Sequence, residues 1–166
     1  RKSTILYSSL LNEHYIHVMQ SYLRGKDINI VALPMNNGIT DLDQITSNFD
    51  DLAAIIIQSP NTLGLLEDWK LTKEKIASSN ALLIAVGDPI ALSVLKPPGE
   101  CGADIYIGEG QTLGNPMNYG GPLLGLMAIK EKYKRRMPGR IIGKTVDKNN
   151  NVGFVLTLQT REQHIR

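Results

Sequence analysis

The chain has 166 residues, of which 42% are hydrophobic and 20% are charged, and its formal net charge is +2. This composition is typical of a globular domain that can bury a core, and the small net charge gives no indication of a nucleic-acid partner. A single cysteine, Cys101, excludes an internal disulfide framework and a cysteine-cluster metal site, and it favours a reducing compartment. No apolar run approaches the roughly 20 residues that cross a bilayer, so we expect no membrane partner.

Strand and helix patterns alternate along most of the chain. In chain order we expect a strand at 4–7, a helix at 12–24, a strand at 28–33, a short helix at 40–48, a strand at 53–57, a helix at 69–79, a strand at 81–86, a short helix at 90–95, and strands at 103–107 and 123–129. The strands at 53–57 and 81–86 are continuously apolar, which is typical of a parallel sheet covered on both faces. The pattern predicts an α/β fold with a three-layer, mainly parallel sheet.

The predicted helix at 12–24 places four apolar side chains on one face at helical spacing. They are Tyr15, Val18, Met19 and Tyr22. Gly25 follows at the position where glycine commonly ends a helix. For the short helix at 40–48 we expect Thr40 and Asp41 to supply the N-terminal cap.

The C-terminal part has a different pattern. Residues 139–146 and 153–158, joined by the polar segment 147–151, predict a β-hairpin. There is no internal repeat and no evident linker, so we expect a single domain over residues 1–166. The chain begins without Met and stops where a helix pattern starts, so we interpret it as part of a longer subunit, truncated at both ends.

Residues 96–128 are rich in glycine. Seven glycines lie between Gly99 and Gly121. Glycine is used where the backbone needs a positive φ or where another group must approach it closely. We therefore predict a loop, between the last two strands of the sheet, that is shaped for close packing or for a ligand.

Polar residues that follow the predicted strands are candidates for a binding site, because doubly wound sheets bind ligands beyond the carboxyl ends of their strands. They are Ser8, Ser9, Gln58, Ser59, Asn61, Asp88 and the segment 108–111. Asp88 has two interpretations, which stay open here. It caps the next helix, or its carboxylate faces a cationic ring nitrogen such as the pyridinium of pyridoxal phosphate.

Other sequence patterns give weaker evidence for a binding site. The segment 108–114 is similar to a dinucleotide fingerprint, but its third glycine is one residue late and Asn115 and Pro116 follow where a helix should run. We interpret the basic cluster at 130–140 as a solvated helix face. The histidines lack metal-ligand spacing, so we expect no metal site, and we assign no catalytic residue.

Five motifs give the chain a family resemblance. They are Leu-Lys-Pro-Pro-Gly-Glu-Cys-Gly-Ala-Asp-Ile at 95–105, Gly-Glu-Gly-Gln-Thr-Leu-Gly at 108–114, Tyr-Gly-Gly-Pro at 119–122, Arg-Met-Pro-Gly-Arg at 136–140 and Leu-Gln-Thr-Arg-Glu-Gln-His-Ile-Arg at 158–166. The chain resembles the glycine cleavage system P-protein family, glycine dehydrogenase (decarboxylating). More narrowly it resembles the N-terminal half, which many bacteria make as a separate subunit 1. This resemblance implies the large domain of a fold-type I pyridoxal-phosphate-dependent transferase.

The resemblance also bears on the cofactor. In the family's C-terminal half a lysine forms the Schiff base with pyridoxal phosphate, and Gln111 stands at its place in this chain. An amide cannot form that bond, so the resemblance implies that the lysine-bearing half holds the cofactor and that this chain binds none covalently. Asp88 matches the acid that holds the pyridine nitrogen. Asp88, Gln111, Gly120 and Gly121 are therefore our candidates for vestigial cofactor-site or interface residues.

For the full enzyme, the resemblance implies glycine decarboxylation with transfer of the aminomethyl group to the lipoyl group of the H-protein. The implied partners of this chain are the lysine-bearing subunit 2, the H-protein and glycine, in the cytoplasm of bacteria with the two-subunit form. Two alternatives stay open. One is a structural or regulatory scaffold with no role in chemistry, and the other is an unrelated aminotransferase-like enzyme that would use Lys96 or Lys130.

Overall fold

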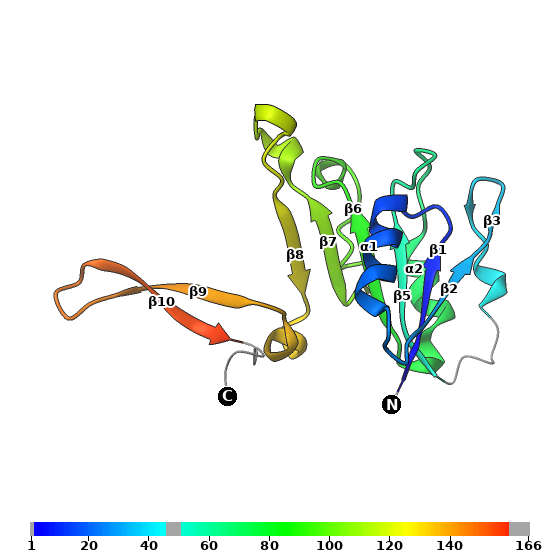
Figure 1. The fold of residues 1–166 in the computed structure, drawn as a ribbon, viewed down its shortest axis with the longest axis horizontal. Coiled ribbons are helices and arrows are strands. Elements are labelled where there is room, and N and C mark those ends of the chain that lie inside the picture. The colour runs from blue at the N-terminus through cyan, green and yellow to red at the C-terminus, as the bar shows by residue number, and fades with distance from the viewer. Residues whose placement is uncertain (1, 46–50, 160–166) are drawn as a thin grey trace. The chain divides into compact units, whose positions relative to one another are not determined.

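A six-stranded sheet dominates the N-terminal part of the computed structural model, which describes residues 2–45 and 51–159 (Figure 1). The strand order is β2-β1-β5-β6-β7-β8. The bounds are Thr4–Ser8 (β1), Asn29–Leu33 (β2), Leu52–Gln58 (β5), Leu82–Gly87 (β6), Ile105–Glu109 (β7) and Gly125–Ile129 (β8). Neighbouring strands from β2 to β7 pair in parallel, whereas the arrow of β8 points against theirs in Figure 1. The prediction of a mainly parallel α/β sheet is confirmed.

Two α-helices cover the sheet, α1 (Glu13–Leu23) and α2 (Trp69–Lys75). Val86 of β6 lines a cavity together with Tyr15 of α1, whereas a side chain at Gly87 would meet Trp69 of α2. Adjacent residues of a strand point to opposite faces, so the two helices lie on opposite faces and the sheet is the middle of three layers. Among the described residues, no helix has the length and apolar character that crossing a membrane requires.

Short 3₁₀ turns make up the other helical segments. They are Leu42–Gln44, Ala77–Ser79, Ala91–Ser93, Gln111–Leu113, Asn118–Gly120 and Glu131–Arg136. The helix predicted at 90–95 was therefore wrong, since the structure has only a 3₁₀ turn at Ala91–Ser93. The helix predicted at 69–79 is present but ends at Lys75. Both segments are too short for the intrinsic helix propensity of their residues to decide the conformation.

The core lies where the central strands meet α2. Leu6, Ile55 and Leu83 are fully buried, and Trp69 and Ile76 pack against them from the helix side. Burial of each side chain of this size contributes about 1.5–3 kcal/mol. Because both faces of the central strands are covered, their residues are apolar without alternation, as the sequence pattern indicated.

The chain divides into two compact units, residues 1–128 and 129–166. In the second unit, β9 (Arg140–Val146) pairs antiparallel with β10 (Val152–Gln159). Asp147 accepts the backbone N–H groups of Asn149 and Asn151 at 2.7 and 2.9 Å, which closes the turn between the strands. These hydrogen bonds hold the pKa of the Asp147 carboxyl below its usual value. The predicted hairpin is confirmed, while the single domain over 1–166 stays a prediction.

The helix predicted at 40–48 was wrong for the residues that the structure describes there. Residues Met35–Asn36 (β3) and Ile39–Thr40 (β4) form a small antiparallel hairpin, followed only by the 3₁₀ turn at Leu42–Gln44. Asn37 and Gly38 both have positive φ, the geometry of a two-residue hairpin turn. Residues 46–50 lie outside the described part of the chain.

A buried carboxylate explains why Thr40 belongs to a strand. Glu67 accepts hydrogen bonds from the Thr40 backbone N–H and hydroxyl at 3.1 and 3.0 Å, and from the Asn61 amide at 2.9 Å. Its own N–H donates to the Ser59 hydroxyl at 2.9 Å, and the Thr40 hydroxyl lies 2.6 Å from that of Ser8. This Glu67 cluster joins the β3–β4 hairpin to the loop after β5, so that Thr40 cannot cap a helix.

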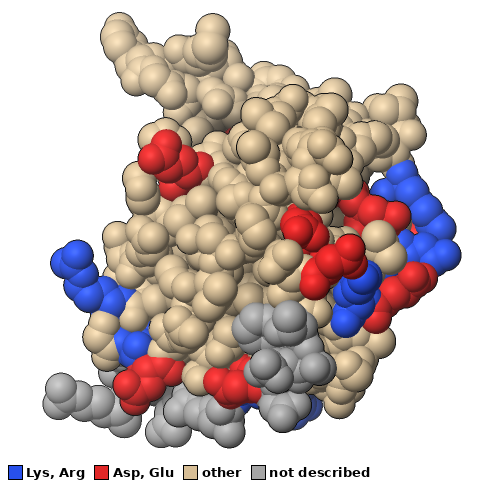
Figure 2. Space-filling view, turned by 90° about the vertical axis from the view of Figure 1, so that its right-hand side faces the viewer, with Lys and Arg blue, Asp and Glu red and all other residues tan. Residues whose placement is uncertain are grey.

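Several apolar side chains of the first unit are uncovered. The face of α1 that carries Tyr15, Val18 and Tyr22 is exposed, as are Met35 and Ile39 of the β3–β4 hairpin. Figure 2 views the β2 end of the sheet, where a broad area bears neither basic nor acidic side chains.

An ion pair fastens α2 to the strands beneath it. Lys73 Nζ donates to Asp104 Oδ2 at 2.6 Å and to the Ala81 carbonyl at 3.1 Å, and the Leu83 N–H donates to the same carboxylate oxygen at 3.1 Å. The Asp104 side chain is only 3% exposed, and that of Lys73 is 31% exposed. Breaking such a pair leaves a buried group uncompensated, which costs more than the pair itself contributes.

We expect Asp104→Ala to lower the free energy of unfolding of the intact protein by about 3 kcal/mol, because the Leu83 N–H and the Lys73 ammonium both lose their partner. Urea unfolding measures the loss. Asp43→Ala is the matched control: Asp43 also lies 2.6 Å from a lysine, Lys75, but its side chain is 84% exposed, so little change is expected. Equal effects of the two substitutions would show that the Asp104 pair does not fasten α2.

Candidate functional site

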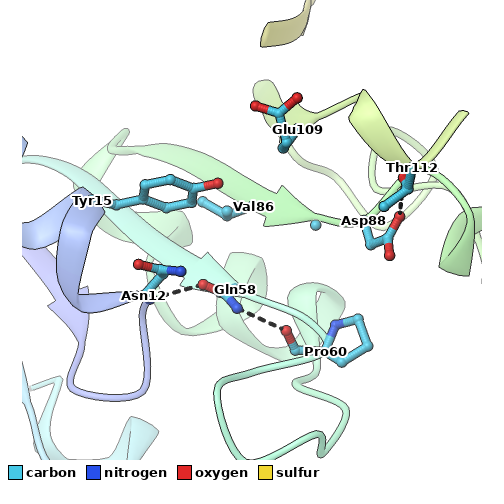
Figure 3. Close-up of a pocket in the computed structure, with 9 residues that line it drawn as sticks. Asn12, Tyr15, Gln58, Pro60, Val86, Asp88, Glu109 and Thr112 are labelled. Carbon is cyan, nitrogen blue, oxygen red and sulfur yellow. Dashed lines mark hydrogen bonds between the residues drawn. The ribbon is translucent and has the colours of Figure 1, made fainter. Parts of the chain in front are cut away.

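The candidate site is a cavity of about 330 Å³ at the carboxyl ends of β5, β6 and β7, beside the first turn of α1 (Figure 3). It is lined by Asn12, Tyr15, Gln58, Pro60, Val86, Gly87, Asp88, Glu109 and Thr112. The structure therefore has a cavity at the carboxyl ends of the strands, where the sequence predicted a binding site. Of the strand-end polar residues singled out in the sequence, Gln58, Asp88 and Glu109 line this cavity, whereas Ser8, Ser59 and Asn61 belong to the Glu67 cluster.

The register of β6 and β7 brings the two acids of the cavity together. Gly87 is the register partner of Gly108, so the next residues, Asp88 and Glu109, emerge at the same level of the sheet edge. A Cβ at Gly108 would lie 2.5 Å from the Gly87 carbonyl oxygen and 2.7 Å from the Tyr106 hydroxyl. Glycine is therefore required at position 108, because the Tyr106 hydroxyl donates to that carbonyl at 3.0 Å.

The pKa of the Tyr106 hydroxyl responds to the charge of Asp88 at this strand end. Burial raises the pKa of this hydroxyl above the usual value of 10.0, and the negative charge of Asp88 and the proximity of Tyr15 raise the pKa further. The shift is the response expected of a phenol beside a carboxylate in a partly dehydrated position.

Asp88 lines the cavity and closes a turn, but it does not cap a helix, since Ile90 is the N-cap residue of the 3₁₀ turn that follows. Its Oδ1 accepts the Ile90 N–H at 2.9 Å and the Thr112 hydroxyl at 3.2 Å. The first bond closes the turn after β6, and the second joins that turn to the segment that follows β7. The interpretation that Asp88 faces a cationic ring nitrogen stays a prediction.

Glu109 fastens the start of the glycine-rich loop, which sequence reasoning did not foresee. Its Oε1 accepts the Gln111 N–H at 3.0 Å and the Leu124 N–H at 2.7 Å. The Gly110 N–H also donates to the Leu124 carbonyl at 2.6 Å. The two ends of the loop are thereby held together, and the only sequence signal for this role was an acid directly after a strand.

The wall on the side of α1 is built by its N-terminal cap. The Asn12 side chain accepts the His14 N–H at 2.9 Å, and the Asn12 N–H donates to Gln58 Oε1 at 2.9 Å. Gln58 Nε2 in turn donates to the Pro60 carbonyl at 3.1 Å. Figure 3 shows the Tyr15 ring extending from α1 beside Val86, with its hydroxyl toward the part of the cavity where Asp88 lies.

The other three sequence candidates lie in the glycine-rich loop. Gln111 begins the 3₁₀ turn after β7, and its side-chain amide occupies the space that a Cβ at Gly121 would need. Gly121 has φ +81° and Gly120 has φ +110°, but nothing lies within 4 Å of a Cβ placed at Gly120. The structure thus brings Gln111 and Gly121 together and places Asp88 at the cavity, and the roles of all four residues stay predictions.

The residues of the cavity do not fit a covalently bound pyridoxal phosphate. None of the nine lining residues is a lysine, and the amide of Gln111 cannot supply the missing amine. Lys96 is exposed and lines a separate pocket with Ser59 and Cys101. Within the part of the chain that the structure describes, no group of three His, Cys, Asp or Glu side chains is arranged to hold a metal ion.

Comparison with known proteins identifies the family. The family model described as glycine cleavage system P-protein matches residues 1–166. A relative from Desulforamulus reducens, named as a glycine dehydrogenase (decarboxylating) subunit 1, is 48% identical over 100% of this chain and 37% of its own length. A relative of the same name from Coprothermobacter proteolyticus is 46% identical over 99% of this chain and 38% of its own length. The chain therefore spans little more than a third of these relatives.

Comparison with solved structures gives the same family as the sequence relatives. The crystal structure of a glycine decarboxylase (P-protein) in inhibitor-bound form superposes with a TM-score of 0.88 at 41% identity, over 99% of this chain and 37% of that one. The cysteine desulfurase CsdA from Escherichia coli has a TM-score of 0.69 at 15% identity, over 98% of this chain and 42% of that one, and so shares the fold. The resemblance in the sequence motifs is confirmed: the chain belongs to the glycine cleavage system P-protein family.

Proposed function

We propose that the chain is part of subunit 1 of glycine dehydrogenase (decarboxylating), the P-protein that decarboxylates glycine and passes the aminomethyl group to the lipoyl group of the H-protein. The names of the relatives at 44–48% identity and the P-protein structure at 41% identity support this activity. In the assembled bacterial enzyme, located in the cytoplasm, the lysine-bearing subunit 2 holds pyridoxal phosphate. When bound, the cofactor supplies the electron sink for loss of CO2.

Within that enzyme this chain is a non-catalytic partner. The proposal rests on Gln111, an amide at the position where the resemblance places the cofactor lysine of the family's other half. Its side chain packs against Gly121 and it is not among the residues that line the cavity. A side chain held in this way supports the loop and takes no part in covalent chemistry.

The loop from 110 to 124 is proposed to contact subunit 2. It presents exposed apolar side chains, among them Leu113, Leu123 and Met117, the last of which is 86% exposed. Tyr119 is fully exposed and has φ 45° and ψ 43°, a left-handed conformation that costs energy for a residue other than glycine. Exposed apolar residues on a strained backbone are typical of a protein contact surface.

Family membership removes the alternative of an unrelated aminotransferase-like domain that would use Lys96 or Lys130. The scaffold alternative makes a different prediction from ours. A scaffold half would assemble with its partner, but changes in the glycine-rich loop would leave turnover unchanged.

The cofactor assignment is tested by borohydride reduction of the assembled enzyme with pyridoxal phosphate, followed by peptide mass spectrometry. We expect one stoichiometric label on a lysine of subunit 2 and only scattered, weak labels on this chain, because no lysine lines its cavity. Stoichiometric labelling of one lysine in this chain, Lys96 for example, would overturn the non-catalytic role.

The loop is tested by Gly121→Val in the assembled enzyme. We expect glycine decarboxylation to fall roughly tenfold or more, because the new side chain meets the Gln111 amide and strains a backbone with φ +81°. Decarboxylation assays and size-exclusion chromatography with subunit 2 give the two readouts.

Gly120→Val is the matched control for that substitution, since position 120 also has positive φ but no neighbour within 4 Å. It reports the backbone strain alone, so we expect a smaller loss. Adding Gln111→Ala should partly restore turnover to Gly121→Val. Intact assembly with unchanged turnover in Gly121→Val would favour the scaffold alternative.

A further inference from the structure

The cavity of this chain is acidic and partly aromatic. Its nine lining residues include two carboxylates, one phenol ring and two amides, and none of them is Lys, Arg or His. Anionic ligands such as phosphates or carboxylates would meet like charge here without a counter-charge, which disfavours them. The remaining wall is formed by Thr112, whose hydroxyl donates to Asp88, and by Val86, Gly87 and Pro60, which are apolar apart from their backbone.

We propose that this cavity binds a small organic cation, an ammonium group carried on a short or flat apolar body. The lining residues all belong to this chain, and the proposal does not depend on the proposed activity. The proposed site binds its ligand without a covalent step, so no covalent bond forms or breaks.

Each carboxylate is oriented through one oxygen, which leaves the other for a ligand. The two hydrogen bonds that Asp88 accepts from described residues both go to Oδ1, from Ile90 and Thr112. The two that Glu109 accepts both go to Oε1, from Gln111 and Leu124. Both side chains are therefore fixed by backbone or side-chain donors before a ligand arrives, and Oδ2 and Oε2 are the acceptors that an ammonium group requires.

Tyr15 supplies a second kind of contact. Its side chain is 40% exposed, and Figure 3 shows the ring beside Val86 with the two acids across the cavity. A cation near a tyrosine face is stabilised by the ring quadrupole, and the apolar body of the ligand would lie against Val86. Asn12 caps the helix that carries Tyr15.

The size of the cavity limits the ligand. About 330 Å³ is at the lower end of the range for ligand pockets, so one ring with an aminomethyl group is the class that fits. Larger polyamines or nucleotides would extend beyond the residues that carry the site.

The test uses a series of ligands that differ in charge at constant shape. The assembled enzyme is first reduced with borohydride, so that the cofactor of subunit 2 is fixed and cannot take up an amine. Crystals are then soaked with 4-bromobenzylamine, 4-bromobenzyl alcohol or 4-bromobenzoate. We expect anomalous bromine density beside Tyr15 and Asp88 for the amine, and none there for the benzoate.

Affinity is measured in solution by fluorine NMR titration of 4-fluorobenzylamine and its alcohol analogue. We expect the amine to bind about tenfold more tightly than the alcohol, as one charge-assisted hydrogen bond allows. Asp88→Asn should weaken binding of the amine about tenfold while keeping the hydrogen bond from the Ile90 N–H. Tyr15→Leu should weaken binding of the amine about threefold. Glu100→Gln, an exposed carboxylate outside the cavity, should leave the affinity unchanged.

Equal affinity for the amine and the alcohol, bromine density only elsewhere, or an Asp88→Asn variant that binds as well as the unaltered protein would each overturn the proposal. The ligand series needs no variant, so it decides the question even if a substitution prevents assembly. The labelling of subunit 2 tests the cofactor assignment separately, so failure of one proposal is distinguishable from failure of the other.

Discussion

The structure of the site depends on the parallel register of β6 and β7. Pairing of Gly87 with Gly108 brings Asp88 and Glu109 to one level of the sheet edge, and the Tyr106 hydroxyl locks that edge by donating to the Gly87 carbonyl. A shift of one residue would turn every side chain of a strand to the opposite face. The buried, continuously apolar strands therefore determine where the acids of the cavity lie.

The loop after β7 begins at that edge of the sheet. Glu109 holds the two loop ends together, and the Gln111 amide fills the space above Gly121. A lysine at position 111 would have to leave that packing to reach a cofactor. The Gln111 side chain is thus part of the loop's support.

Prediction from sequence was accurate where one local rule decided the outcome. Continuous apolar runs gave the central strands, and Asp88, which follows a strand, lines a cavity at the strand ends while its role stays a prediction. It was wrong at Thr40, whose propensity to cap a helix was overridden by the buried carboxylate of Glu67, distant in sequence. It missed Tyr15 as a cavity residue, because the role of that side chain depends on which elements pack beside it.

The sequence by itself determined the α/β class, the C-terminal hairpin and the family. These follow from hydrophobic periodicity, turn residues and residue identity, which are local properties of the chain. Only the tertiary structure decided that one oxygen each of Asp88 and Glu109 is taken by structural bonds, and that Tyr15 faces them across a cavity. Those arrangements join α1, β6 and β7, and such long-range packing is not encoded in any single segment.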